Sequence, residues 1–152
     1  YTICNFNNHA SALVDLLDPE PRNTFITGVF EPFFFKIALA FLPNNGICFD
    51  LGANTGFCSF GLVQQKPNVH YHMFEANEDL VTQIAKSTKL PQNENTFFLI
   101  ITAAYLNMMD IPTLMWIIIR LVSHTLLPKT SMESEFKTCY LIIIANKIIL
   151  HR

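Results

Sequence analysis

Charged residues are scarce in this sequence of 152 residues: 14% are charged and 51% are hydrophobic, and the formal net charge is −2. A typical globular chain has about 25% charged residues. A chain this apolar collapses around a core, which excludes intrinsic disorder as its main description. No run of lysine or arginine occurs, which argues against nucleic acid as a principal partner. The length fits one domain with a sizeable core.

Paired cysteines are also lacking. The four cysteines are scattered, form no C-x-x-C pair and follow no secretory leader: Cys4, Cys48, Cys58 and Cys139. This arrangement is typical of free thiols in the cytosol and argues against a disulfide framework or a zinc finger. We therefore expect a cytoplasmic protein.

Glycine is missing from residues 62–152, because all five glycines lie before that point: Gly28, Gly46, Gly52, Gly56 and Gly61. Average usage would place about six glycines there. The same region has blunt apolar runs, over 97–101, 114–119 and 141–144, without polar alternation. Two accounts compete: a natural hydrophobic second half, or a domain interrupted by truncation or a shifted reading frame. We favour the second and expect residues 105–152 to pack poorly.

A membrane span is a third account of the apolar tail. Residues 96–119 are apolar enough to suggest one, but Asn107, Asp110 and Pro112 interrupt the stretch. Residues 114–127 are fewer than the ~20 that a span needs, and they include Arg120 and His124. A buried helix is therefore favoured over membrane association.

The first hundred residues alternate between helical and strand patterns. Helices are predicted over 9–17, 30–42, 57–65 and 78–89, and strands over 47–51, 69–75 and 96–102. Pro19 and Pro21 are expected to end the first helix, and Asn77 to cap the last. In the second helix, the core-facing side is predicted from its spacing: Phe33, Ile37 and Phe41.

This order predicts an α/β fold, an incomplete Rossmann-like fold with a parallel sheet and right-handed crossovers. We expect the chain to divide into a helical lead-in (1–45), a cofactor-binding βαβαβ core (46–104) and an apolar C-terminal segment (105–152), for which a truncated or non-native sequence is the favoured account.

A glycine-containing loop gives the clearest functional signal. Gly52-Ala53-Asn54-Thr55-Gly56 follows the strand 47–51, and Glu75 ends the next strand, 23 positions after Gly52. Glycines at a strand-to-helix turn let a ligand approach the backbone closely. An acid at the tip of the neighbouring strand can accept hydrogen bonds from ribose hydroxyls. We expect a pocket for a nucleoside-bearing cofactor at the carboxyl ends of the strands.

The loop pattern narrows the choice of cofactor. A dinucleotide fingerprint needs G-x-G-x-x-G, whereas Asn54 and Phe57 stand where two of its glycines would be. The ATP-binding G-x-x-x-x-G-K-[ST] motif is absent. Asp50, just before the loop, would repel a pyrophosphate and suits a cofactor with an ammonium and a sulfonium. S-adenosylmethionine fits, with its amino-acid end near the loop and its ribose at Glu75.

The runs FDLGANTGFCSFGL (49–62) and HMFEANEDL (72–80) resemble the first two motifs of the FkbM-type S-adenosylmethionine-dependent methyltransferases. The resemblance covers about residues 46–104. It implies methyl transfer to an oxygen of a small molecule or sugar, and a cofactor site made of Asp50, Gly52, Asn54, Gly56 and Glu75. Two features depart from the family pattern. Ala76 replaces a common proline, and residues 105–152 contain no Asp-x-Glu-Gly segment. No catalytic base can be named.

Alternative functions stay open from the sequence. The chain is either this enzyme or a non-catalytic remnant of it; a nicotinamide-dependent oxidoreductase is disfavoured by Asn54, and a membrane-associated protein is supported only by the tail. His70 and His72 share a strand face, but no third metal ligand stands nearby. Cys58 lacks an identifiable base and is interpreted as a buried thiol.

Overall fold

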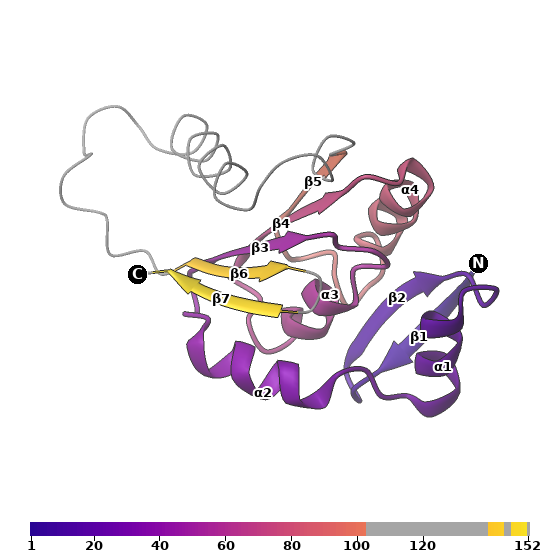
Figure 1. The fold of residues 1–152 in the computed structure, drawn as a ribbon, viewed down its shortest axis with the longest axis horizontal. Coiled ribbons are helices and arrows are strands. Elements are labelled where there is room, and N and C mark those ends of the chain that lie inside the picture. The colour runs from indigo at the N-terminus through magenta and orange to yellow at the C-terminus, as the bar shows by residue number, and fades with distance from the viewer. Residues whose placement is uncertain (103–139, 145–146, 152) are drawn as a thin grey trace.

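The computed structural model describes residues 1–102, 140–144 and 147–151, and its main element is a five-stranded sheet of order β5-β4-β3-β6-β7 (Figure 1). Its strands are β3 (Ile47–Leu51), β4 (His70–Glu75), β5 (Phe98–Thr102), β6 (Tyr140–Ile144) and β7 (Lys147–His151). Strands β3, β4 and β5 pair in parallel, β6 is parallel to β3, and β7 is antiparallel to β6. The predicted α/β class with a parallel, partial Rossmann-like sheet is confirmed.

The elements of the predicted βαβαβ core form where the sequence pattern placed them. The three strands agree with β3, β4 and β5, and the helices are α3 (Phe57–Val63) and α4 (Glu78–Ser87). Asn77 caps α4 as predicted, because its side-chain oxygen accepts a hydrogen bond of 2.9 Å from the Asp79 backbone N–H. Local signals were therefore sufficient in this part of the chain.

The helix predicted over residues 9–17 is wrong. Residues Ala10–Val14 form β2, which pairs antiparallel with β1 (Thr2–Phe6). The missed signal is Asn7-Asn8, since both residues adopt positive φ angles, 49° and 68°. Asparagine tolerates this left-handed backbone and is favoured in hairpin turns.

The prolines that were expected to end that helix instead begin one. Helix α1 runs over Pro19–Thr27, with prolines in its first turn, where the missing N–H removes no intrahelical hydrogen bond. Asp18 caps this helix by accepting from the Glu20 N–H, and Gly28 ends it with φ 68°. Gly28 also accepts a 2.8 Å hydrogen bond from the Asn7 N–H, which joins α1 to the hairpin.

Helix α2 (Pro32–Phe41) forms as predicted, but its buried side is a different one. The predicted core face is the exposed one: Phe33, Ile37 and Phe41 are 76%, 48% and 54% exposed. The buried residues are Phe34, Phe35 and Ala38. Apolar residues surround this helix on nearly all sides, so its pattern does not determine which side faces the core.

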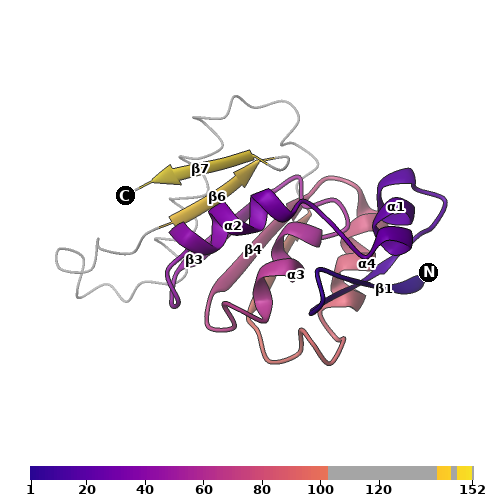
Figure 2. The ribbon, with the colours of Figure 1, turned by 90° about the horizontal axis from the view of Figure 1, so that it is seen from below.

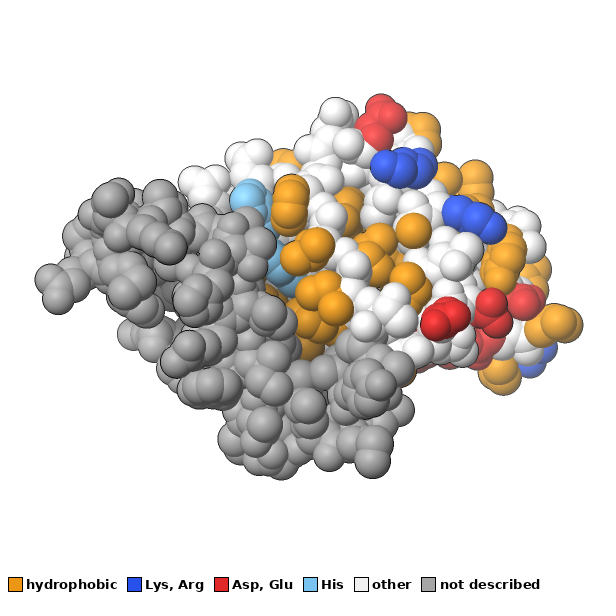
Figure 3. All heavy atoms as spheres, turned by 90° about the horizontal axis from the view of Figure 1, so that it is seen from above, with side chains coloured by type: hydrophobic (Ala, Val, Ile, Leu, Met, Phe, Trp, Pro, Cys, Tyr) orange, Lys and Arg blue, Asp and Glu red, His pale blue; other side chains and the backbone are white. Residues whose placement is uncertain are grey.

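Two helices, α2 and α3, lie against one face of the sheet (Figure 2). That face carries Cys48 and Asp50 of β3, and Tyr71 and Met73 of β4, as alternate residues of each strand. On the opposite face Phe97, beside β5, is 44% exposed and contacts the rings of two histidines, His70 and His72. Hydrophobic and histidine side chains gather on the described part of this face (Figure 3).

Most of the apolar tail lies outside the described residues, so the predicted poor packing of 105–152 and the division into three parts stay predictions. Residues 140–144 and 147–151 form strands β6 and β7. Within the described residues, no single helix has the length and apolar composition to cross a bilayer; α1 and α2 reach those limits only together, and they are bent by 88°. The stretches 103–119 and 114–127 lie outside the described residues.

Candidate active site

The glycine loop follows β3, the strand at which the order of strands across the sheet reverses direction. From β3 the chain moves outward to β4 and then β5, whereas β6 pairs with the other side of β3. Ligands of open α/β sheets bind at such a switch point, outside the carboxyl ends of the strands. The hairpin and α1 lie beyond the end toward which β3 points (Figure 1).

Hydrogen bonds to β4 hold the loop in its conformation. The N–H groups of Gly52 and Ala53 both donate to the Phe74 carbonyl oxygen, at 2.9 and 3.0 Å. The Asn54 N–H donates to Glu75 Oε2 at 2.8 Å. Gly52, Asn54 and Gly56 all have left-handed φ angles, of 76°, 52° and 81°. The glycines are required because L side chains rarely adopt this backbone.

Glu75 points toward the loop, as the sequence analysis required, but most of its hydrogen-bonding capacity is used. It is 9% exposed. Its Oε1 accepts from the Ala76 and Asn77 N–H groups at 2.8 and 2.9 Å, and its Oε2 accepts from Asn54. A carboxylate has about four acceptor positions, so the described residues leave one, on Oε2. Glu75 therefore organises the loop and offers a single acceptor to a ligand.

Asp50 lies beneath the loop rather than in a cavity. Its side chain is 2% exposed, and Oδ2 accepts a 2.7 Å hydrogen bond from the Ser59 hydroxyl of α3. Burial raises the pKa of Asp50 to about 6, although the Ser59 hydrogen bonds oppose the shift. This contact makes Asp50 a structural carboxyl that joins β3 to α3.

Gly56 is also a packing position. A Cβ atom at Gly56 would lie 2.5 Å from a ring carbon of Phe60 and 2.7 Å from the terminal carbon of Met73. At Gly52, by contrast, a Cβ would meet nothing within 4 Å. The two glycines thus have different roles: Gly56 lets α3 pack against β4, and Gly52 leaves open space beside the loop.

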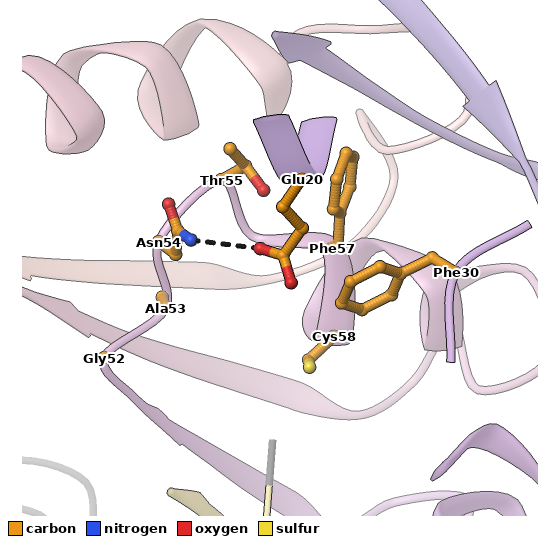
Figure 4. Close-up of a pocket in the computed structure, with 8 residues that line it drawn as sticks. All are labelled: Glu20, Phe30, Gly52, Ala53, Asn54, Thr55, Phe57 and Cys58. Carbon is orange, nitrogen blue, oxygen red and sulfur yellow. Dashed lines mark hydrogen bonds between the residues drawn. The ribbon is translucent and has the colours of Figure 1, made fainter. Parts of the chain in front are cut away.

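A cavity of about 240 Å³ opens beside this loop (Figure 4). It is lined by Glu20, Phe30, Gly52, Ala53, Asn54, Thr55, Phe57 and Cys58. Two of the predicted site residues, Gly52 and Asn54, line it, whereas Asp50, Gly56 and Glu75 do not. The sequence did not assign Glu20, Phe30, Phe57 or Cys58 to the site. Glu20 and Phe30 have no local signal, because they lie 32 and 22 positions before Gly52.

Glu20 brings negative charge to this cavity. Its Oε2 accepts a 3.3 Å hydrogen bond from the side-chain amide of Asn54 (Figure 4). Although Glu20 is an exposed residue, desolvation raises the pKa of its carboxyl, and the negative charges of Asp18 and Glu31 raise it further. The aromatic rings of Phe30 and Phe57, with centroids 4.9 Å apart, form an apolar wall opposite the loop.

The two histidines do not form a metal site with other described residues, and of the described cysteines only Cys58 lines the cavity. His70 is exposed and His72 is 1% exposed, and neither ring nitrogen of His72 has a hydrogen-bond partner in the part of the chain that the structure describes. Among the described residues, no three His, Cys, Asp or Glu side chains come together as metal ligands. Cys58 is buried, and burial raises its thiol pKa well above the usual value. Cys4 and Cys48 are likewise buried, and none of these three cysteines forms a disulfide bond among the described residues; Cys139 lies outside them.

Comparison with known proteins finds a distant likeness in structure. No protein family and no curated protein matches the chain. Among solved structures, a Plasmodium falciparum chain described as a protein-L-isoaspartate O-methyltransferase, in complex with S-adenosyl-L-homocysteine, is similar with a TM-score of 0.42 and 13% identity. The match covers 77% of this chain and 61% of that one, so this chain spans about three fifths of its length. A match at this level assigns neither activity nor cofactor, and the FkbM resemblance stays a prediction.

Proposed function

We propose that the chain is an S-adenosylmethionine-dependent methyltransferase of the FkbM type that methylates an oxygen of a small molecule or sugar. The proposal is supported by the resemblance over residues 49–62 and 72–80 and by the cavity beside the loop at the switch point. The acceptor class comes from the resemblance alone, and no residue is assigned as a base.

The choice of cofactor depends on the hydrogen bonds that the loop N–H groups make. Those of Gly52, Ala53 and Asn54 donate to β4, and that of Gly56 donates to the Ala53 carbonyl oxygen. A pyrophosphate site needs free N–H groups aimed at the anion. In this loop, most of the N–H groups donate to acceptors within the protein. This argues against a dinucleotide and favours a cofactor without phosphate.

The residues fit the two ends of S-adenosylmethionine differently. The cavity of about 240 Å³ is smaller than the ~300 Å³ at which whole-ligand sites begin, so it suits one end of the molecule. We place the amino-acid end there, beside the open space at Gly52. One ribose hydroxyl then donates to the remaining acceptor position of Glu75 Oε2.

When bound, this cofactor would supply a methyl group on a sulfonium sulfur, and its transfer to an acceptor hydroxyl would release S-adenosylhomocysteine, with the hydroxyl proton passing to solvent. The residues of this chain contribute by positioning. The loop fixes the backbone of Gly52, and the rings of Phe30 and Phe57 exclude water from one side of the cavity.

The test is calorimetric titration with S-adenosylmethionine, S-adenosylhomocysteine and NAD on the wild type and two glycine variants. Gly52→Ala places a methyl group in the open space beside the loop and should weaken binding of both adenosyl ligands. Gly28→Ala is the matched control, because Gly28 has a similar φ of 68° and equally open surroundings but does not line this cavity. Both variants carry a similar backbone strain of about 1 kcal/mol.

Equal binding to wild type and Gly52→Ala would contradict the placement at the loop, and binding of NAD alone would overturn the cofactor. Tight binding of S-adenosylmethionine with no methyl transfer to any oxygen acceptor would favour the non-catalytic alternative.

A further inference from the structure

Glu20 reaches the glycine loop from a distant part of the chain. It lies in the first turn of α1, 34 positions before Asn54, and its carboxylate faces the cavity in the close-up (Figure 4). The Asn54 amide is the only hydrogen-bond partner of the Glu20 carboxylate among the described residues. That bond uses Oε2, so Oε1 is available to a ligand.

The N-terminal hairpin holds this part of the site in place. Asp18 accepts from the Glu20 N–H at 3.3 Å, which fixes the start of α1. The Asn7 side chain bonds both backbone groups of Phe30: its amide donates to the carbonyl oxygen at 2.8 Å, and its oxygen accepts from the N–H at 3.0 Å. Glu20 and Phe30, the two lining residues outside the βαβαβ core, are therefore supported by hydrogen bonds of their own.

The surroundings of Glu20 are negative. Asp18 and Glu31 are close enough to raise the pKa of Glu20, and no lysine or arginine among the described residues lines the cavity. A carboxylate beside two other acids is stabilised by a bound cation. An ammonium group, with three donors and a full positive charge, makes the strongest hydrogen bonds to such a group.

We propose that Glu20 binds the ammonium group of the cofactor's amino-acid end and makes the cavity selective for cationic ligands. This inference rests on the proposed function, because it names a contact within that site. The methylene groups of the amino-acid end then lie against Phe30 and Phe57, and the Asn54 amide keeps the Glu20 carboxylate oriented. The same carboxylate repels phosphate-bearing cofactors.

The experiment compares three ligands on three proteins by calorimetry. S-adenosylmethionine has an ammonium and a sulfonium, S-adenosylhomocysteine has the ammonium alone, and 5′-methylthioadenosine has neither. The variant is Glu20→Gln, whose amide oxygen still accepts from Asn54. The control is Glu31→Gln, which removes a nearby negative charge from a residue that does not line the cavity.

For Glu20→Gln we expect the affinity for S-adenosylmethionine and S-adenosylhomocysteine to fall about tenfold or more, which is the effect of losing one charge-assisted hydrogen bond. The affinity for 5′-methylthioadenosine should stay within about twofold, as should all three affinities of Glu31→Gln. Far-UV circular dichroism and the thermal midpoint verify that each variant is folded.

Three results would overturn the role of Glu20: unchanged binding of both amino-acid-bearing ligands, an equal loss for all three ligands, or a loss confined to S-adenosylmethionine, which would place the carboxylate at the sulfonium. Failure of the wild type to bind any adenosyl ligand would instead refute the proposed function.

Discussion

Replacing Asp50 by asparagine should change how stability depends on pH. This buried carboxyl has its pKa raised to about 6, mainly by desolvation, against an ordinary value of 3.8. The folded protein therefore binds this proton more tightly than the unfolded chain does. The stability gained from this tighter proton binding is fully present below pH 3.8 and is lost as the pH rises through 6.

The size of the effect follows from the difference between the two pKa values. A difference of about two units corresponds to about 3 kcal/mol of unfolding free energy, of which roughly 2.5 kcal/mol is lost between pH 4 and 8. Asp50→Asn cannot ionise and does not have this loss. Its stability relative to wild type should therefore improve by about that amount across the range.

Urea denaturation of both proteins at several pH values between 4 and 8 measures this difference. Other titrating groups occur in both proteins, so their contributions largely cancel. Ser59→Ala provides a second comparison, because removing the 2.7 Å hydrogen bond should raise the Asp50 pKa further and steepen the loss. A free-energy difference between wild type and Asp50→Asn that does not vary with pH would refute the reasoning.

Three further predictions use the same denaturation assay. Burial lowers the pKa of His72 to about 4, so the unfolding free energy of the wild type should fall as the pH falls from 6.5 toward 4. His72→Leu should not show this fall. If the unfolding free energies of both proteins vary with pH in the same way, the lowered pKa of His72 is contradicted. Gly56→Ala should cost about 2–4 kcal/mol through strain and collision with Phe60, against about 1 kcal/mol for Gly28→Ala, and equal losses would disprove the contact. Phe34→Ala should lower the unfolding free energy by about 3–5 kcal/mol, and Phe33→Ser by less than about 0.5 kcal/mol. A larger loss for Phe33→Ser than for Phe34→Ala would show that the face predicted from spacing is the buried one.

The core from β3 to β5 could be predicted because each of its elements has a local signal. Strand β3 is an apolar run bounded by turn residues, and α4 has an N-cap and an acidic first turn. Such signals depend on neighbouring residues only. The hairpin had a local signal too, in Asn7-Asn8, but the helical spacing of the following residues concealed it.

The site was predicted in part. The sequence placed Gly52 and Asn54 beside the cavity and Glu75 beside the loop. It did not show that three backbone N–H groups occupy the Glu75 carboxylate, because that depends on the angle at which the loop meets β4. Nor did it show Glu20, whose approach to Asn54 depends on how the hairpin and α1 dock.

The sequence by itself determined the order of strands and helices from β3 to β5, since turn residues, caps and apolar periodicity act over a few positions. The tertiary structure alone decided which side of α2 is buried, because an almost entirely apolar helix is oriented by what it packs against. It also decided that Asp50 faces Ser59 while Glu20 faces the cavity. Both outcomes follow from contacts between segments far apart in the chain, whose geometry no local pattern records.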